Sequence, residues 1–166
     1  MHYGCYCGAG FELKARDRKS MVDDIDQFCS SACLLKFLQE TGDSSRLKDL
    51  VVSTRPNVRP ANLHGVYDRE IDMWFRSGYE VAVERFFRQH RIHWLYETRI
   101  IVYRDTVAYY LPDFLLPDHG YLVEVKGLWL RNAKKKFNKA LKNKFPLILI
   151  PDYLIKDIKR NAIHSN

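Results

Sequence analysis

Two apolar, β-rich runs around a short turn constrain the fold of this 166-residue chain more than any other feature. The first run covers residues 110–117 and the second covers residues 121–127. Residues 117–120, with the sequence Pro-Asp-His-Gly, are typical of the turn between two strands. Apolar residues make up 46% of the chain, which is enough to bury a core. The pattern therefore predicts a β-hairpin packed into that core.

Charged residues interrupt both runs: Asp113 lies in the first, and Glu124 and Lys126 lie in the second. Because strand side chains alternate between faces, Glu124 and Lys126 point the same way and Val125 turns into the core. Two carboxylates and one ammonium on neighbouring strands suit Mg²⁺, or Mn²⁺ in its place, because hard cations take oxygen ligands. The lysine can orient or deprotonate an attacking water, or neutralise charge on a phosphate, so we expect phosphodiester cleavage. The simpler alternative is a solvated Glu124–Lys126 ion pair on an exposed hairpin.

These charged residues belong to a larger pattern. Pro112-Asp113 followed by Glu124-Val125-Lys126 resembles the signature of the PD-(D/E)xK nuclease superfamily. The order and spacing of four segments are similar to the junction-resolving endonuclease I family of T-odd bacteriophages: residues 76–80 (RSGYE), 96–97 (YE), 112–117 (PDFLLP) and 123–129 (VEVKGLW). This resemblance covers residues 76–150, with one additional residue in the turn at 118–120, and none of the first 65 residues.

The resemblance implies a set of roles for the site. Asp113 and Glu124 would hold the metal ion with the carbonyl of Val125, and Lys126 would position the attacking water. Glu80 would complete the site or bind a second ion. Products would carry 5′-phosphate and 3′-hydroxyl ends. The family also implies an intertwined homodimer, in which Glu80 can come from the partner chain.

A purely structural role for Glu80 competes with this one. Ser77 followed three residues later by Glu80 fits a capping box at the start of a helix, which requires no catalysis. Glu84, one helical turn later, is the alternative ligand. Glu97 is a candidate supporting residue, although an exposed position at a sheet edge also explains it.

The chain contains four cysteines, and all of them lie in two close pairs near the amino terminus: Cys5, Cys7, Cys29 and Cys33. In a reducing compartment such pairs favour a structural, tetrahedral Zn²⁺ over disulfides, and buried free thiols are the alternative. The second pair resembles the end of a treble-clef zinc finger. The first pair is separated by one residue instead of two, so His2 is an alternative ligand to Cys5.

Composition divides the chain into three parts: a zinc-finger-like module at 1–45, a Pro-containing linker at 46–65 and a nuclease domain at 66–166. Residues 1–45 hold 5 Lys and Arg against 7 Asp and Glu, whereas residues 46–166 hold 22 against 13. The positive excess therefore accompanies the candidate nuclease, as a DNA substrate requires. Arg55 and Arg59 in the linker are candidate DNA contacts, although solvated arginines are as common.

The nuclease domain is predicted to follow the order helix, three strands, helix, strand, helix, in a mixed α/β fold. We expect helical structure from 67 to about 90, with a boundary near 76–78 where Ser77 caps a second helix. Antiparallel strands at 93–104 and 106–111 should join the hairpin, followed by a strand at 147–150 and a terminal helix at 153–160. A helix over 131–144 should turn its apolar residues inward and its cations outward. Its predicted DNA-binding residues are Arg131, Lys134, Lys135, Lys136, Lys139 and Lys142.

No window approaches the roughly 18 apolar residues of a membrane span, and the amino terminus has no secretory pattern, so we expect a soluble, cytoplasmic protein. Three functions compete. The first is cleavage of branched DNA such as a Holliday junction. The second is a sequence-directed homing or mobile-element endonuclease that reads DNA through the zinc module. The third is a non-catalytic nucleic-acid-binding protein, which the combination of Asp113, Glu124 and Lys126 disfavours.

Overall fold

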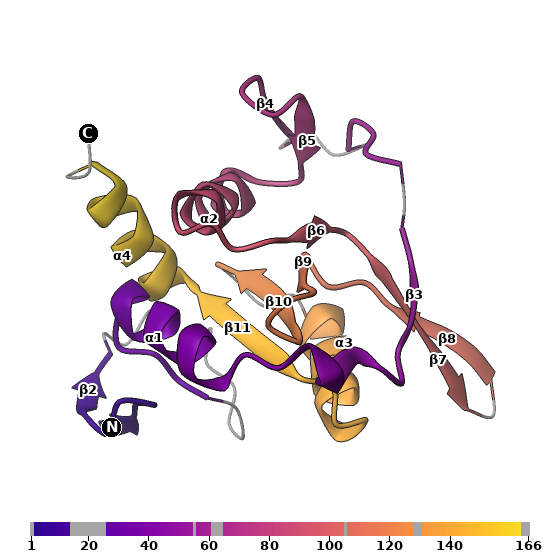
Figure 1. Cartoon of the computed structure of the whole chain (residues 1–166), viewed down its shortest axis with the longest axis horizontal. Helices are drawn as coiled ribbons and strands as arrows, with labels where there is room; N and C mark the ends of the chain where they lie inside the picture. Colours follow the sequence, from indigo (N-terminus) through magenta and orange to yellow (C-terminus); the bar gives the residue numbers. More distant parts are fainter. Residues whose placement is uncertain are drawn as a thin grey trace.

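A four-stranded mixed sheet lies at the centre of the computed structural model, which describes residues 2–13, 26–54, 56–60, 65–104, 106–127 and 131–163. Its strands, in spatial order, are β11 (Leu147–Pro151), β10 (Tyr121–Lys126), β9 (Phe114–Leu116) and β6 (Leu95–Tyr96). β10 runs parallel to β11 and antiparallel to β9, and β9 runs antiparallel to β6. Helix α3 (Arg131–Lys142) provides the crossover that a parallel pair requires (Figure 1). The predicted mixed α/β class is confirmed.

The predicted hairpin is formed by β9 and β10, with Leu122 opposite Leu115. Its turn depends on Gly120, which adopts a φ of 73° and donates a hydrogen bond from its N–H to the Leu116 carbonyl at 2.9 Å. A Cβ at this position would lie 1.9 Å from the carbonyl oxygen of Asp43. Glycine is therefore required both by the backbone angle and by the segment packed against the turn.

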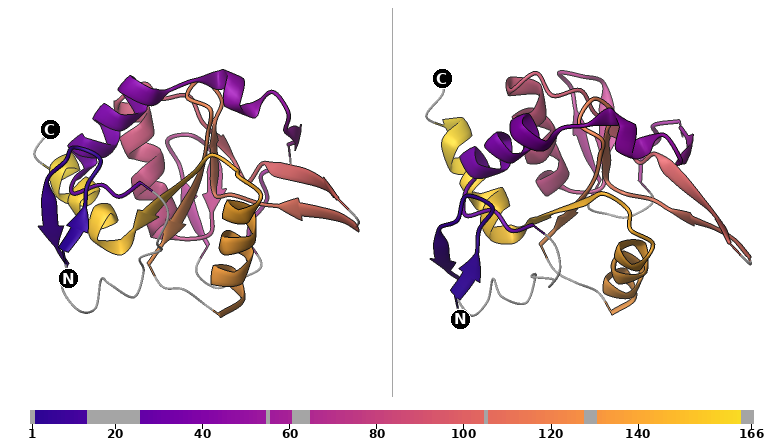
Figure 2. Two further views of the ribbon diagram at one scale, coloured as in Figure 1. Left: turned by 90° about the horizontal axis from the view of Figure 1, so that it is seen from below. Right: turned by 60° about the horizontal axis from the view of Figure 1, so that its bottom comes forward.

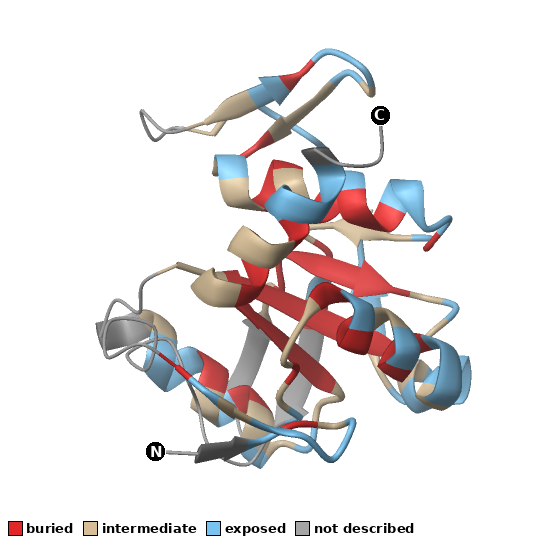
Figure 3. Cartoon of the chain, turned by 90° about the vertical axis from the view of Figure 1, so that its left-hand side faces the viewer, coloured by how far each residue is buried: buried red, intermediate tan, exposed pale blue. Residues whose placement is uncertain are grey.

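Alternation along β10 divides the core into two layers. Val123 and Val125 pack in the layer that contains α1 (Ser31–Thr41), α2 (Gly78–Gln89) and α4 (Asp152–Ile163). Leu122 packs in the other layer, against Phe137 and Ala140 of α3. Figure 2 shows α3 on the side of the sheet opposite α4, and Figure 3 shows the buried strands between the two layers. Val125 thus turns into the core, as predicted, and Glu124 and Lys126 share the face of Leu122.

Smaller sheets surround this centre. β7 (Arg99–Arg104) and β8 (Thr106–Tyr110) form an antiparallel ribbon that extends away from the central sheet (Figure 1), with β3 (Val51–Ser53) along its edge. β1 (His2–Gly4) and β2 (Gly10–Glu12) form a hairpin beside the short turn that carries the first cysteine pair. A 3₁₀ helix, η2 (Ser44–Leu47), connects α1 to β3. Among the described residues, no helix is long and apolar enough to span a bilayer.

The expectation of a helix beginning at residue 67 is wrong for its first third. Residues 66–75 form a two-stranded hairpin of β4 (Val66–Asp68) and β5 (Met73–Phe75), with Tyr67 opposite Trp74. Asp72 in the turn adopts a φ of 54°, which a helix excludes. Over so few residues, the spacing of Ile71, Trp74 and Phe75 fits a strand pair as well as a helix, and the cross-strand aromatic pair stabilises the strands.

The expectation that the strand at 106–111 joins the hairpin in one sheet is also wrong. β8 ends at Tyr110 and pairs with β7, whereas β9 begins at Phe114 in the central sheet. Pro112 lies between them and has no N–H to continue a ladder, so the chain changes sheets at this point. Asp113 consequently precedes a strand instead of lying within one.

Candidate active site and cysteine cluster

The structure brings Asp113, Glu124 and Lys126 together at the end of β10. Lys126 Nζ lies 2.7 Å from Glu124 Oε1 and 3.9 Å from Asp113 Oδ2. Asp113 Oδ2 also accepts a hydrogen bond from the Val125 N–H at 2.7 Å, which fixes the carboxylate against the strand that carries the other two groups. Alternation places Glu124 and Lys126 on one face, and the break at Pro112 positions Asp113 beside them.

A tyrosine that the sequence pattern did not reveal orients Glu124. The Tyr110 hydroxyl donates a hydrogen bond to Glu124 Oε2 at 2.6 Å, so Tyr110 and Lys126 bind different oxygens of one carboxylate. Tyr110 ends the strand of the other sheet, 14 residues before Glu124. No local sequence signal predicts this contact, because it depends on how the two sheets meet.

Glu80 lies at the first turn of α2, where Ser77 is the N-cap. The Ser77 hydroxyl accepts from the Glu80 N–H at 3.3 Å, as the capping pattern predicted, and it also donates to Glu80 Oε1 at 2.9 Å. The other oxygen, Oε2, accepts from the Arg76 N–H at 3.0 Å and from the Tyr96 hydroxyl at 2.5 Å. Burial, followed by the charge of Asp113, raises the pKa of Glu80 to about 7. Glu80 is therefore both a capping residue and an electrostatic neighbour of Asp113.

Glu84, the alternative to Glu80, belongs to a different cluster. Its Oε1 accepts from Arg88 Nε at 3.1 Å, and its charge interacts with those of Asp68 and Arg85. Asp68 in turn accepts two hydrogen bonds from the Arg85 guanidinium, at 3.0 and 3.2 Å. This cluster attaches α2 to the β4–β5 hairpin and is separate from the carboxylates at β10.

Glu97 supports the site through its backbone. Its N–H donates to the Asp113 carbonyl at 3.0 Å, and its side chain forms an ion pair with Arg76. Glu97 adopts a φ of 46°, in the left-handed region, where the chain leaves β6 for β7. Tyr96 and Glu97 therefore position Glu80 and Asp113, respectively, from adjacent positions in the chain.

The electrostatics of the site suit an added cation. Burial raises the pKa of Asp113, and burial together with the charge of Asp113 raises the pKa of Glu124 to about 7. Burial alone would lower the pKa of Lys126, but the charges of Asp113 and Glu124 outweigh it and raise the pKa, so Lys126 remains an ammonium. With Glu80, the three acidic groups exceed the positive charge of Lys126. This excess of negative charge favours a cation, but the side-chain oxygens of Asp113, Glu124 and Glu80 do not form a group close enough together to share one ion.

The amino-terminal cysteines form a second cluster. The sulfurs of Cys5, Cys7, Cys29 and Cys33 all lie within 4.8 Å of one another, and none of these cysteines forms a disulfide. Cys5 Sγ lies 3.3 Å from both Cys33 Sγ and Cys7 Sγ, and Cys7 Sγ lies 3.7 Å from Cys29 Sγ. Tetrahedral Zn²⁺ with bonds of ~2.3 Å places its sulfurs about 3.8 Å apart, so this cluster can hold a metal ion such as Zn²⁺. In the described part of the chain, it is the one group of three or more His, Cys, Asp or Glu side chains close enough to share an ion.

The one-residue gap of the first pair is accommodated by a turn. The Gly8 N–H donates to the Cys5 carbonyl at 2.9 Å, and the Cys5 N–H donates to the Ala9 carbonyl at 3.1 Å. Gly8 adopts a φ of 81°, which closes the turn so that both sulfurs face the second pair. Cys5 thus lies in the cluster, while the side chain of the alternative ligand His2 lies outside the described residues.

The cysteine segment shares the core of the central sheet. Phe28 and Leu34 are buried in the layer that contains α2 and α4. The N–H and hydroxyl of Ser31 both donate to Asp157 Oδ2 of α4, each at 2.7 Å. The N-terminus of α1 is therefore attached to the last helix of the chain through a carboxylate.

Helix α3 has the predicted division into two faces. Phe137 and Ala140 are buried, and the exposed cations are Lys134, Lys135, Lys136, Lys139 and Lys142. Because α3 covers the face of β10 to which Glu124 and Lys126 belong, its lysines lie on the same side of the sheet as these residues. The side chain of Arg131 and the residues Arg55, Leu128 and Trp129 lie outside the described part of the structure.

Comparisons with known proteins give one match. A sequence model of phage endonuclease I matches residues 65–151, which is more than half of the chain and includes every carboxylate of the site together with Lys126. No curated protein and no solved structure matches the chain. The matched segment contains the β4–β5 hairpin, α2, the central sheet and α3, and excludes the cysteine cluster. The chain belongs to the phage endonuclease I family.

Proposed function

We propose that this protein is a Mg²⁺-dependent DNA endonuclease that hydrolyses phosphodiester bonds and prefers branched DNA such as a Holliday junction. The observation that carries the proposal is the convergence of the buried carboxylates Asp113 and Glu124 with the partly buried Lys126 at the end of β10. Membership of the phage endonuclease I family supports the reaction class.

Asp113, Glu124 and the carbonyl of Val125 would hold Mg²⁺, or Mn²⁺ in its place. Glu80 would complete the set or bind a second ion, and sharing one ion would require the three carboxylates to move closer together than they lie in this structure. The ion would supply positive charge for the phosphate and a bound water of lowered pKa. The surrounding hydrogen bonds support this assignment, because each carboxylate is held by the protein before any substrate arrives. Asp113 is held by the Val125 N–H and Glu124 by the Tyr110 hydroxyl.

Lys126 would act as an ammonium in this mechanism. Its raised pKa keeps it protonated at neutral pH, so it would donate a hydrogen bond to the attacking water or to a phosphate oxygen. The Tyr96 hydroxyl and the Ser77 hydroxyl would hold Glu80 in one orientation through its two oxygens. Side chains that are already held in position lower the activation barrier of hydrolysis, because they do not have to reorganise during the reaction.

The DNA backbone would follow the exposed lysines of α3. These cations share the catalytic face of the sheet, and α3 contains no acidic residue to compete with phosphates. The proposal extends to two copies of the chain, because two sites can nick two strands of a junction symmetrically. We further propose a zinc-bound module at 1–45, a linker at 46–65 and a nuclease domain at 66–166, acting inside a cell whose reducing conditions keep the cysteines free.

The cysteine cluster favours a second candidate, a sequence-directed homing or mobile-element endonuclease. The cluster lies outside the segment that matches phage endonuclease I, and zinc-binding modules can read duplex DNA. In that case residues 1–60, including Arg59, would contact a specific duplex site. The acidic balance of residues 1–45 favours the first candidate, because phosphate binding needs cations.

One assay separates the candidates. Equal concentrations of a four-way junction, a plain duplex and a single strand are incubated with the protein, with and without Mg²⁺. We expect the junction to be cut fastest, and a Lys126→Ala variant to lose roughly 100-fold or more in rate. Lys36→Ala is the matched control, because Lys36 is 60% exposed on α1 and should leave the rate unchanged.

The other outcomes of this assay each favour a different function. Cutting at discrete positions of a long duplex would favour the homing endonuclease. Binding without any Mg²⁺-dependent cleavage would favour a non-catalytic nucleic-acid-binding protein and refute the proposal.

A further inference from the structure

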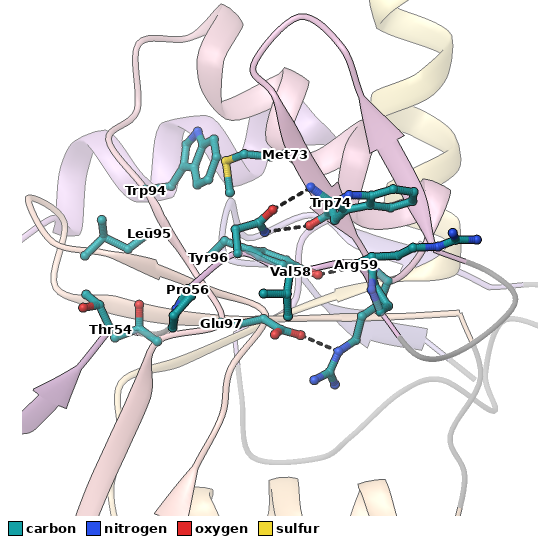
Figure 4. Close-up of a pocket in the computed structure, with 14 residues that line it drawn as sticks. Thr54, Pro56, Val58, Arg59, Met73, Trp74, Trp94, Leu95, Tyr96 and Glu97 are labelled. Atoms are coloured by element: carbon teal, nitrogen blue, oxygen red, sulfur yellow. Dashed lines mark hydrogen bonds and ion pairs between the residues drawn. The ribbon is translucent and has the colours of Figure 1, made fainter.

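A pocket lined by aromatic side chains opens beside the carboxylate site (Figure 4). Its volume is about 760 Å³. Trp74 from β5 and Trp94 and Tyr96 from the segment around β6 line one part of it, and the linker residues 56–60 line another. These aromatic side chains are only partly buried in the free protein. The pocket therefore contains partly exposed aromatic rings, of which Trp74 contacts the Tyr67 ring and the Arg59 guanidinium in the free protein, and such rings suit a ligand with flat faces of its own.

The part of the pocket that is lined by linker residues 56–60 is held in place by a single side chain. Asn57 Nδ2 donates to the Trp74 carbonyl at 2.9 Å, and the Trp74 N–H donates to Asn57 Oδ1 at 2.7 Å (Figure 4). Asn57 thus extends the edge of β5 as another strand would. The Arg59 guanidinium then lies 5.3 Å from the centre of the Trp74 ring. Residues 56–60 precede the segment that matches phage endonuclease I.

A buried hydroxyl in the pocket lining is not used by the protein. Thr98 is 1% exposed, and its Oγ1 has no hydrogen-bond partner among the described residues. A buried hydroxyl without a partner costs roughly 1–3 kcal/mol of stability, and a ligand could satisfy it if the Thr98 side chain rotated toward the pocket. The lining therefore combines stacking surfaces with a polar atom, which matches the faces and the edge of a nucleobase.

The pocket is connected to the carboxylates by its own lining residues. Tyr96 donates its hydroxyl hydrogen bond to Glu80, and the Glu97 N–H donates to the Asp113 carbonyl. The Arg76 guanidinium, 47% exposed, pairs with Glu97 at the boundary between the two sites. Two arginines, Arg59 and Arg76, thus supply positive charge to the pocket, as the phosphates of a nucleotide require.

We infer that this pocket binds a single unstacked nucleobase of the DNA strand next to the bond that is cut. The inference rests on the proposed nuclease function and specifies its substrate: DNA with an unpaired or easily unstacked nucleotide, as occurs at a branch point. A base must leave the helical stack to present both faces to aromatic rings, and this costs least where it is already unpaired. Stacking on aromatic rings accepts any base, so the pocket selects DNA structure and not sequence.

The test measures binding in the absence of cleavage. Mg²⁺ is omitted and no chelator is added, so that the cysteine cluster keeps its metal. Three fluorescent DNAs of equal length are compared by anisotropy: a paired duplex, a duplex with one unpaired base, and the same duplex with an abasic residue at that position. We expect the unpaired base to bind at least about fivefold more tightly than the abasic residue, because stacking contributes ~1–3 kcal/mol per base.

Two variants assign this preference to the pocket. Trp74→Leu should abolish the difference between base and abasic residue, whereas Lys36→Ala should preserve it, because Lys36 is exposed on α1 and does not line the pocket. Thr98→Val removes the unpartnered hydroxyl without changing the shape of the side chain. It should leave the melting temperature unchanged or raised and reduce the preference about threefold or more.

The inference is overturned if wild-type protein binds the base and the abasic residue equally. It is also overturned if both Trp74→Leu and Thr98→Val retain the full preference while folded. Loss of Mg²⁺-dependent cleavage with the preference intact would refute the nuclease function and leave the pocket assignment standing. Cleavage of the junction without the preference would support the nuclease function and refute the pocket assignment.

Discussion

Replacing Asp157 with alanine tests whether the cysteine segment and the central sheet fold as one unit. Asp157 Oδ2 accepts from the N–H and the hydroxyl of Ser31, each at 2.7 Å, and Ser31 is the first residue of α1. The N–H groups in the first turn of a helix have no partner within the helix, so this carboxylate satisfies one of them and opposes the positive end of the helix dipole.

The expected loss in the free energy of unfolding follows from the hydrogen bonds that Asp157→Ala removes. Each hydrogen bond to a charged group contributes roughly 1.5–3 kcal/mol, giving ~3–6 kcal/mol for two. The Asp157 side chain is 21% exposed, so water weakens both bonds, and alanine favours the helix by about 0.5 kcal/mol. We therefore expect Asp157→Ala to lower the free energy of unfolding by about 3 kcal/mol. In a chain of this size that shift lowers the melting temperature by roughly 6–12 °C.

Urea denaturation followed by tryptophan fluorescence measures this loss, because the tryptophans lie outside the cysteine segment. Arg160→Ala is the control: Arg160 is 72% exposed, lies 3.6 Å from the other oxygen of Asp157, and should cost less than about 1 kcal/mol. A double-mutant cycle with Ser31→Ala isolates the part of the coupling that the Ser31 hydroxyl carries, because the backbone N–H of residue 31 still donates to Asp157. A loss below about 0.5 kcal/mol for Asp157→Ala, or an equal loss for Arg160→Ala, would refute the reasoning.

Three further predictions concern stability and metal binding. Gly120→Ala should cost about 2–5 kcal/mol in urea denaturation, because φ is 73° and the added Cβ meets the Asp43 carbonyl, whereas Gly78→Ala meets no atom within 4 Å and should be neutral or stabilising. Cys29→Ser should remove about one bound zinc per chain, as measured by atomic emission, and lower the melting temperature; an unchanged zinc content would exclude Cys29 as a ligand. Burial opposes ionisation of Asp68, but the Glu70 N–H and Arg85 outweigh it and lower the pKa of Asp68 below its ordinary value of 3.8. The ionised carboxylate thus contributes stability above pH ~4 that is lost as the pH falls through the lowered pKa. The free energy of unfolding, measured against pH, should fall less on the acid side for Asp68→Asn than for the wild type. An equal fall in both proteins would contradict this account.

The sequence alone determined the local parts of this protein. Alternation in residues 121–127 assigns Glu124 and Lys126 to one face of a strand and Val125 to the other, and the structure confirms it. The Ser77–Glu80 capping pair and the two faces of α3 were predictable for the same reason: each depends on the fixed repeat of a strand or a helix over a few residues. The pairing of the cysteines into one cluster followed from their spacing and from the preference of thiolates for a shared metal ion.

The tertiary structure decided which distant residues meet. Pro112 sends the strands on either side of it into different sheets, and the hydroxyl of Tyr110 reaches Glu124 only because those sheets adjoin. Glu80 and Glu84 are equivalent on a helical repeat, yet packing places Glu80 near Asp113 and Glu84 beside Arg88. The aromatic pocket requires the linker to fold back onto β5 through Asn57. Such contacts depend on the balance of burial and hydrogen bonding over the whole chain, and no short sequence pattern encodes that balance.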